Sequence, residues 1–314
     1  MKKIEKHKIT KTKIAVIFLS IVTILVSLLI NSNLFFGISS KTIYSFFGIN
    51  EFSSKSDSYP LSVHFIDVGC GDSILIKCGD KTALIDTGSF SYNGKAKYYL
   101  EHCGVEKLDL FIATHTDSDH IGDFSSIADN FKISELWISE FCISNNTERT
   151  NSEITFFNKI EEKNIKVFYP NTDTSYFLGE AELKVLSPSK KYDAQNDNSL
   201  VIKLIYEDVS FLFTGDAGED AEKEMLSENI ELKATVLKLA HHGSKTATTE
   251  EFLNAVSPKY AVISSGNENV YLPNRDVVER VEEFGSEILR TDVDGSIIIA
   301  TDGKTIKTFK ENEE

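Results

Sequence analysis

The segment THTDSDHIG at residues 114–122 limits what this chain can be more than any other feature of its sequence. It directly follows the apolar run LDLFIA, which predicts a β-strand that ends in a polar turn. The turn holds four side chains of metal-ligand type within six residues: His115, Asp117, Asp119 and His120. Carboxylates that converge without a cation repel each other, so an ordinary polar turn with Asp119 as a helix cap is the weaker interpretation. We predict a metal centre at the end of this strand.

Three further apolar runs end in residues of the same kind. ALIDTG contains Asp86, FLFTGD ends at Asp216, and VLKLAHHG contains the pair His241 and His242. Each run alone is weak evidence, because an Asp often closes a turn and paired histidines are often structural. Four such strand ends in one chain are specific, since sheet-based enzymes place their ligands there.

The rest of the chain from Leu61 alternates short β-rich runs with helical segments. Helices are expected near residues 120–130, 151–163, 218–228, 248–257 and 274–284, and a closing hairpin around Asp294-Gly295. An apolar fraction of 41% is enough to build a core. The pattern predicts one layered α/β domain with a mixed pair of sheets. No C-x-x-C occurs, so we expect the cysteines to act as small hydrophobic side chains and leave their pairing open: Cys70, Cys78, Cys103 and Cys142.

This ordered set of motifs resembles the metallo-β-lactamase fold superfamily, and within it the C-terminal hydrolase domain of the ComEC/Rec2 competence proteins. The resemblance covers about residues 61–309 and rests on VHFIDVGCGDSILI, ALIDTG, THTDSDHIG, NDNSLVIKL, FLFTGD, LKLAHHGSKTAT, YAVISSGN and RTDVDGSI. It implies a four-layer αββα sandwich. It also implies a dinuclear metal site at one sheet edge and hydrolytic chemistry.

The resemblance assigns a role to each motif residue. His115 and Asp117 match the ligands of a first ion, and Asp119 and His120 those of a second. Asp216 matches a carboxylate that bridges both ions, while Asp86 matches the residue that orients the site through hydrogen bonds. The final ligand falls on His241 or His242. We take His242 as the ligand and His241 as a catalytic donor to the substrate, and the reverse assignment stays open. Asp119, with His241 and Asp86, completes the expected catalytic group.

The chain departs from the wider superfamily in its first metal site. Asp117 stands where most members have His, and the stretch from Asn196 to Ser199 replaces a loop that normally supplies a third His. Oxygen ligands suit Mn or Mg better than an imidazole-rich site does. We therefore expect two divalent ions, Zn or Mn, with the first site weak or filled only with substrate. Substrate contacts are expected from four polar residues: Asn198, Ser199, Ser244 and Lys245.

Two further departures concern single loops. Cys70 stands where this branch has Gln in the pattern VGxGD. The stretch NVYLP at residues 269–273 is shorter than the usual NxYGHP and lacks its His. Because that His lies near the catalytic mouth in the family pattern, its loss bears on activity.

The N-terminal region predicts a membrane anchor. Residues 1–13 hold six Lys and one Glu, and residues 14–30 form an uncharged apolar run. Such a run is close to the length that spans a bilayer, and the preceding lysines predict that this end stays inside. A cleaved signal peptide, which would give a secreted protein, and a buried core helix are the alternatives. We expect a basic tail over 1–13, a transmembrane signal anchor over 14–36, a linker over 37–60 and a hydrolase domain over 61–310.

The charge distribution bears on the substrate. The chain has a net charge of −15, residues 1–54 carry +5, and the remainder therefore carries about −20. So acidic a domain is not a general binder of nucleic acid. Only four Arg are present, which leaves few bidentate clamps for phosphate. Bound metal ions could stabilise the negative charge of the phosphoryl group in place of arginine side chains.

The leading hypothesis is an extracytoplasmic, membrane-anchored phosphodiesterase or nuclease that acts on DNA through a hydroxide held between the two ions. With one membrane segment, DNA uptake would need a separate channel protein; no obligate protein partner is predicted. A cell-surface esterase of the phosphorylcholine type is a second hypothesis, and a catalytically weak binding module is a third. Acyl or lactam hydrolysis is disfavoured, because those enzymes keep a His-rich first site. An aromatic cage for choline would draw on Phe90, Tyr92 and Tyr271, although core packing is the simpler expectation for them.

Overall fold

A computed structural model describes residues 51–92, 94–144, 148–172, 174–228, 230–267 and 269–313. Its first sheet has eight strands in the order β17-β16-β1-β2-β3-β5-β7-β8. β3, β5, β7 and β8 are parallel, and the other neighbours are antiparallel. The strands are β1 (Leu61–Phe65), β2 (Ile74–Cys78), β3 (Lys81–Ile85), β5 (Leu110–Ala113), β7 (Leu136–Ile138), β8 (Val167–Phe168), β16 (Ile297–Thr301) and β17 (Ile306–Lys310).

The second sheet has seven strands in the order β15-β14-β13-β12-β11-β10-β9. The strands from β12 to β15 are parallel, and those from β9 to β12 are antiparallel. They are β9 (Ser175–Leu178), β10 (Ala181–Ser187), β11 (Val201–Tyr206), β12 (Val209–Phe213), β13 (Val236–Lys238), β14 (Tyr260–Ile263) and β15 (Glu287–Arg290). A separate two-stranded sheet joins β4 (Lys107–Leu108) and β6 (Lys132–Ile133).

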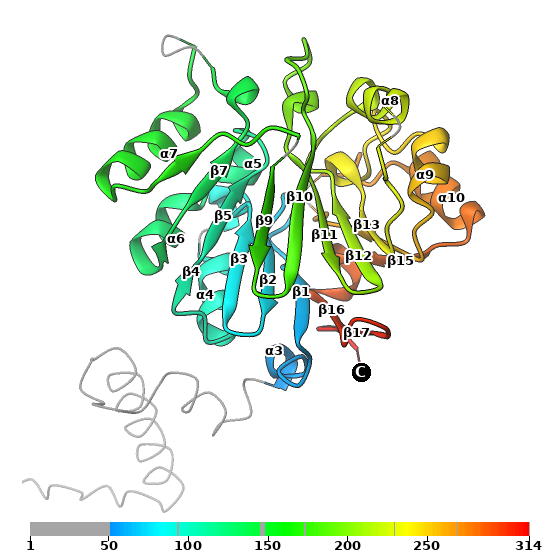
Figure 1. The fold of residues 1–314 in the computed structure, drawn as a ribbon, viewed down its shortest axis with the longest axis horizontal. Helices are drawn as coiled ribbons and strands as arrows, with labels where there is room; N and C mark the ends of the chain where they lie inside the picture. The colour runs from blue at the N-terminus through cyan, green and yellow to red at the C-terminus, as the bar shows by residue number, and fades with distance from the viewer. Residues whose placement is uncertain are drawn as a thin grey trace, which may run out of the picture. The chain divides into compact units, whose positions relative to one another are not determined.

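Helices cover the outer face of each sheet, as Figure 1 shows. The first sheet carries α4 (Lys95–His102), α6 (Phe124–Asn130) and α7 (Asn151–Glu162), and the second carries α8 (Glu219–Ser227), α9 (Glu250–Val256) and α10 (Arg275–Phe284). Shorter helices are α3 (Glu51–Ser54), α5 (Ser118–Ile121) and α11 (Thr291–Asp294), with 3-10 turns η1 (Phe90–Tyr92), η2 (Glu140–Cys142), η3 (Asn196–Asn198) and η4 (Ala240–Gly243).

Three hydrophobic clusters show that the arrangement is four-layered. One cluster fills the space between the sheets, with Ile76 from the first and Phe211 from the second. The strands alternate, so Leu84 of β3 instead faces outward and packs beneath the helices of the first sheet. A third cluster lies between the second sheet and its helices, and it includes Leu237 of β13 and Phe252 of α9. The mixed α/β sandwich predicted from the motifs is therefore present.

Local sequence signals explain several helix ends. α7 begins at a capping box, in which the Thr150 hydroxyl accepts from the Glu153 backbone and the Glu153 carboxylate accepts from the Thr150 backbone. α10 begins at the cap Asn274 and ends at Gly285, whose φ of 92° suits only a residue without a side chain. These ends lie within a few residues of the predicted ones.

Two predictions about elements were inaccurate. The helix expected over 120–130 is two helices, α5 and α6, because the backbone leaves the helical conformation at Asp123, which has φ −98° and ψ 12°. The closing hairpin does not turn at Asp294-Gly295. It joins β16 to β17, and the Asp302 carboxylate closes its turn by accepting from the backbone of Lys304 and Thr305.

The expected basic tail (1–13), the signal anchor (14–36) and most of the linker (37–60) lie outside the described residues. The last part of the linker is described: Ser56 is buried and its hydroxyl lies 3.3 Å from Nε2 of His64 on β1. Across residues 51–313, as far as they are described, no helix has the length and apolar character needed to cross a bilayer.

Candidate metal centre

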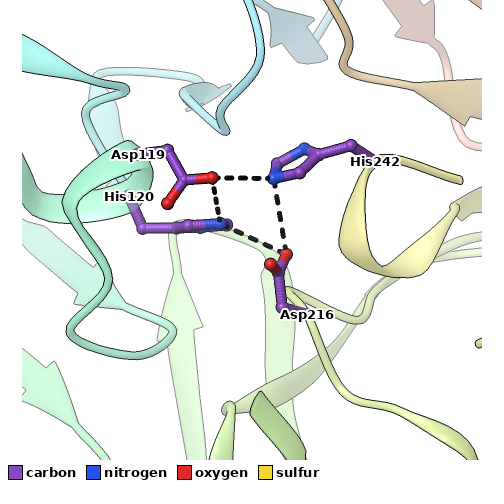
Figure 2. A group of neighbouring side chains, drawn as sticks. All are labelled: Asp119, His120, Asp216 and His242. Atoms are coloured by element: carbon purple, nitrogen blue, oxygen red, sulfur yellow. Dashed lines mark ion pairs between the residues drawn. The ribbon is translucent and has the colours of Figure 1, made fainter. Parts of the chain in front are cut away.

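Four side chains from both sheets meet at one edge of the sandwich (Figure 2). Asp119 and His120 lie on α5, directly after β5 of the first sheet, and Asp216 follows β12 of the second. His242 lies in η4, after β13. One ligand atom from each residue falls within 4.8 Å of all the others. Strand ends that are far apart in the sequence thus build one cluster.

The closest atom pairs inside this cluster join imidazole nitrogens to carboxylate oxygens. Nε2 of His120 is 3.2 Å from Oδ1 of Asp216, and Nε2 of His242 is 3.3 Å from Oδ2 of Asp119. Nε2 of both histidines and Oδ1 of Asp216 are buried without a hydrogen-bond partner. Buried polar atoms are rarely left in this state unless an ion or water satisfies them. Two imidazoles and two carboxylates that share such a space fit a divalent cation.

Hydrogen bonds on the far side of each ring set the orientation of the imidazoles. Nδ1 of His120 is 2.8 Å from Oδ2 of Asp86, and Nδ1 of His242 donates to the carbonyl of Ser264 at 3.0 Å. With the proton on Nδ1, each ring presents the lone pair of Nε2 to the cluster. This is the arrangement that outer partners impose on metal-binding histidines.

Asp86 is held in place by the strand that carries the main motif. Its Oδ1 accepts from the Thr114 backbone at 2.8 Å, and its Oδ2 accepts from the Thr114 hydroxyl at 2.7 Å. The side chain is fully buried, and the residue has a φ of 57°. Asp86 therefore lies behind His120, where the resemblance implied an orienting residue.

A second group of side chains lies around the other oxygen of Asp216. Nε2 of His115 is 3.9 Å from Oδ2 of Asp216 and 3.7 Å from Oδ2 of Asp117, and Nε2 of His241 is 3.7 Å from Oδ2 of Asp216. Nε2 of His115 is also buried without a hydrogen-bond partner. The carboxylate of Asp216 thus stands between two groups of ligand-type atoms, the position a bridging ligand needs.

The cluster is strongly coupled electrostatically. Burial alone would raise the pKa of Asp216, but His120 and His242 outweigh that effect and hold its pKa well below the usual value. Burial would likewise lower the pKa of His120, yet Asp216 and Asp86 raise it well above 6.5. Asp216 is therefore ionised at neutral pH, and a cation would take the place of the proton on Nε2 of His120.

A sequence profile of the metallo-beta-lactamase superfamily matches residues 66–266. The chain belongs to that superfamily. This match supports a metal-dependent hydrolase family for the chain. Within this fold, the chain's His/Asp cluster could hold divalent metal ions.

Curated relatives confirm the resemblance to ComEC/Rec2 proteins. The chain is 30% identical to ComE operon protein 3 of Bacillus subtilis over 255 residues, which are 75% of this chain and 32% of that protein. It is 32% identical to Recombination protein 2 of Haemophilus influenzae over 242 residues, 75% of this chain and 28% of that protein. The chain therefore spans about a third of the length of these relatives.

Solved structures agree on the fold. The metallo-beta-lactamase fold protein YhfI from Bacillus subtilis has a TM-score of 0.51 at 13% identity, with 75% of this chain and 98% of that chain covered. CmlA, a diiron beta-hydroxylase from Streptomyces venezuelae, has a TM-score of 0.51 at 10% identity, with 80% and 54% covered. At these identities the likeness concerns the fold alone.

For this member of the superfamily, the structure distinguishes the two adjacent histidines. His242 is buried with Nε2 toward Asp119 and Asp216, while His241 is about one-third exposed. Both have left-handed backbone angles, with φ of 49° and 55°. Of the pair, only His242 belongs to the four-residue cluster, and the more exposed His241 lies beside Oδ2 of Asp216.

Two of the four expected substrate-binding residues, Asn198 and Ser199, form hydrogen bonds with the backbone of neighbouring loops. The Asn198 amide accepts from the backbone of Tyr192 and donates to the carbonyls of Tyr192 and Ala194, so both of its polar atoms already have partners in the fold. The Ser199 hydroxyl accepts from the backbone of Asp216 at 3.3 Å and supports that loop.

The other two substrate candidates follow His242. The Ser244 hydroxyl is 3.0 Å from that of Thr246, and Lys245 is exposed. The Ser244 side chain is thus buried and paired, whereas the Lys245 side chain is exposed and is the more accessible of the two.

Sequence reasoning missed several residues that support the site. The Asn196 amide lies 3.4 Å from Nδ1 of His241, a contact that the sequence did not predict. Asp72 and Lys238 also lie behind His242. Their positions inside the motifs GCGD and LKLAHHG were the available signal.

The aromatic candidates are not core residues, contrary to the simpler expectation. Phe90 is 69% exposed and Tyr271 is 83% exposed. Tyr92 is only partly buried, and the Lys95 ammonium lies 4.7 Å from its ring centre. The backbone of Phe90 packs against Gly122, so this aromatic side chain is displayed just beyond α5.

Proposed function

We propose that this protein is an extracytoplasmic, membrane-anchored, metal-dependent phosphodiesterase that cleaves DNA. The observation that carries the proposal is the position of Asp216 between two groups of ligand-type side chains. Its Oδ1 lies with Asp119, His120 and His242, and its Oδ2 lies with His115. Two-ion sites of this kind suit in-line displacement at phosphorus.

Each group would hold one of two divalent ions, Zn or Mn. Asp119, His120 and His242 would hold the second ion, His115 and Asp117 the first, and Asp216 would contact both. Bound ions would supply a water molecule of lowered pKa and positive charge facing the phosphoryl oxygens. The ligands proposed for the first ion, His115 and Asp117, include only one imidazole, which favours Mn at that position and predicts weaker occupancy.

His241 would act on the substrate as a hydrogen-bond donor. The Asn196 amide lies on the Nδ1 side of the ring, which leaves the proton on Nε2. Burial lowers the pKa of His241, so the ring is neutral at pH 7. A neutral imidazole whose Nε2 proton lies beside Oδ2 of Asp216 would meet charge that develops on a phosphoryl oxygen bound there. Lys245, exposed in the following loop, would contact a neighbouring phosphate.

The cellular setting follows from the N-terminal sequence. Residues 14–36 would anchor the chain with residues 61–310 outside the cytoplasm. The relatives named for competence and recombination support DNA as the substrate. A role in DNA uptake would require a separate channel protein as a partner.

One observation favours a second candidate, a cell-surface phosphodiesterase of the phosphorylcholine type. Phe90 in η1 and Tyr271 are large exposed aromatic side chains; the backbone of Phe90 contacts Gly122 after α5, and Pro273, two residues after Tyr271, contacts Gly243 of η4. Exposed aromatic faces bind quaternary ammonium groups. A weak binding module is disfavoured, because all the ligand-type side chains are in place.

Activity assays of the full-length chain against a panel of substrates would test the proposal. We would load it separately with Mn²⁺ and Zn²⁺ and assay single-stranded DNA, double-stranded DNA, a simple diester reporter and a phosphorylcholine ester. The nuclease proposal predicts metal-dependent DNA cleavage that falls at least about a hundredfold in Asp119→Ala. Turnover of the small esters alone would support the second candidate. Metal binding without turnover of any substrate would contradict both the nuclease proposal and the second candidate.

A further inference from the structure

A buried ion pair, Asp72 and Lys238, lies next to the four-residue cluster and includes none of its four members. Nζ of Lys238 is 2.9 Å from Oδ2 of Asp72, and the side chains are 0% and 2% exposed. The ammonium also donates to the carbonyl of Leu239 at 2.9 Å. Buried ion pairs are weak contributors to stability, and well-packed apolar residues often serve a core better. The position of the pair therefore calls for a reason other than packing.

The pair joins the two halves of the sandwich at the level of the ligands. Asp72 belongs to the loop between β1 and β2 of the first sheet, and Lys238 ends β13 of the second. A Cβ atom at Gly71 would lie 2.4 Å from the carbonyl oxygen of Asp119, so this loop presses directly on the ligand segment. On the other side, Lys238 precedes His242 by only four residues.

Asp72 also faces the imidazole of His242. Oδ1 of Asp72 is 3.7 Å from Nδ1 of His242 and is buried without a hydrogen-bond partner. It lies on the Nδ1 side of the ring, opposite the nitrogen that faces Asp119 and Asp216. A carboxylate beside Nδ1 favours the proton on that nitrogen and strengthens Nε2 as a ligand.

We propose that Asp72 and Lys238 are positioning residues of the metal centre. The Ser264 carbonyl accepts the Nδ1 proton of His242, and Asp72 places a negative charge beside the same nitrogen, which favours that proton position and leaves Nε2 as the ligand. Lys238 holds Asp72 and thereby ties the β1–β2 loop to β13, so that ligands from both sheets keep one geometry. This inference rests on the proposed function, because it requires that the cluster bind metal.

A double-variant comparison separates positioning from packing. We would prepare Asp72→Asn, Lys238→Met and the combined variant in the full-length chain, and measure thermal stability and affinity for Zn²⁺ and Mn²⁺ separately. Each single variant leaves one buried group unpaired and should lower both stability and affinity. The combined variant has no unpaired charge and should regain most of the stability. Its metal affinity should stay about 10- to 100-fold below that of the wild type.

The matched control is Lys203→Met, which removes another buried lysine of the same sheet. Nζ of Lys203 donates to the carbonyl of Glu231 at 2.8 Å, and we expect a loss of stability with unchanged metal affinity. A combined variant that binds metal as tightly as the wild type would overturn the positioning role and leave the proposed function intact. A wild-type chain that binds neither ion would overturn the metal centre itself, and the positioning role with it.

Discussion

At the scale of single residues, the site depends on which nitrogen of each imidazole is free. His120 is turned by Asp86 and His242 by the Ser264 carbonyl, so both present Nε2. These hydrogen bonds explain why Asp86 and Ser264, which lie behind the imidazole rings, affect the geometry of the cluster.

Asp86→Asn should weaken metal binding at least about tenfold with little change in the fold. An amide offers one acceptor oxygen, whereas the Asp86 carboxylate is contacted by the Thr114 backbone, the Thr114 hydroxyl and His120. Asn tolerates the left-handed backbone angle of this position. Calorimetric titration with Zn²⁺ would measure the affinity. An unchanged dissociation constant would show that Asp86 does not orient His120.

His64 gives a residue-scale prediction outside the metal centre. Burial, with a contribution from Lys77, lowers the pKa of His64 from 6.5 to about 3. The folded state therefore keeps His64 neutral while the unfolded state takes up a proton below pH 6.5. The free energy of unfolding should fall as the pH drops from 6.5 toward 3, by up to about 1.4 kcal/mol per pH unit from this group.

His64→Gln removes that titration, while its amide retains the capacity to bond the hydroxyls of Ser62 and Tyr99. Urea unfolding at pH 7 and pH 5 should show a smaller pH dependence in the variant than in the wild type. Equal dependence in the two proteins would mean that His64 is protonated in the folded state.

The sequence predicted the residues that carry ligand-type atoms better than it predicted the residues that support them. The spacing in THTDSDHIG identified four residues that do meet at one sheet edge. It left the choice between His241 and His242 open, because adjacent residues differ only in the backbone angles that direct them. Asp72 and Lys238 were not foreseen, because their contact depends on how the two sheets are packed face to face.

At the scale of elements, the loops that follow buried strands carry the chemistry. The turn after β5, the loop after β12 and η4 after β13 all end at the same edge of the sandwich. The β1–β2 loop packs against them, and its Gly71 has no room for a side chain.

Gly71→Ala should therefore displace the segment that carries Asp119 and weaken metal binding about tenfold or more. Gly79→Ala is the matched control, because a Cβ atom there would meet nothing within 4 Å. Gly79 has a φ of 58°, so its variant should lose stability alone. Thermal unfolding and zinc titration of both variants would separate the effects. Equal metal affinity in the two would contradict the role given to the close contact.

Element boundaries were predictable where local chemistry determines them. The capping box at Thr150 and Glu153 is readable from the sequence, as is the end of α10 at Gly285. The closing hairpin was misplaced because Asp-Gly occurs twice, at Asp294 and at Asp302. Only the pairing of β16 with β17 distinguishes the two turns.

At the scale of the whole molecule, the two sheets are joined by their core and by the metal cluster. Asp119 and His120 come from the half that contains the first sheet, and Asp216 and His242 from the half that contains the second. The superfamily fold was predictable because the motifs occur in a set order along the chain. The four-layer packing follows from strands whose two faces are both apolar.

Removal of metal should lower the stability of the whole domain. A ligand that binds only the folded state at a hundred times its dissociation constant stabilises by about 2.7 kcal/mol. We expect a clear rise in melting temperature when Zn²⁺ or Mn²⁺ is added and a reversal with chelator. Asp216→Ala should show no such rise, because it removes the residue common to both ligand groups. A rise of equal size in that variant would place the bound metal elsewhere.

The most direct test of the account is a crystal structure of the zinc-loaded chain with anomalous scattering recorded at the zinc edge. The account predicts a strong anomalous peak among Asp119, His120, Asp216 and His242. A second, weaker peak is expected beside His115 and the other oxygen of Asp216. An anomalous map without a peak among those four side chains would contradict the assignment of this cluster as the metal centre.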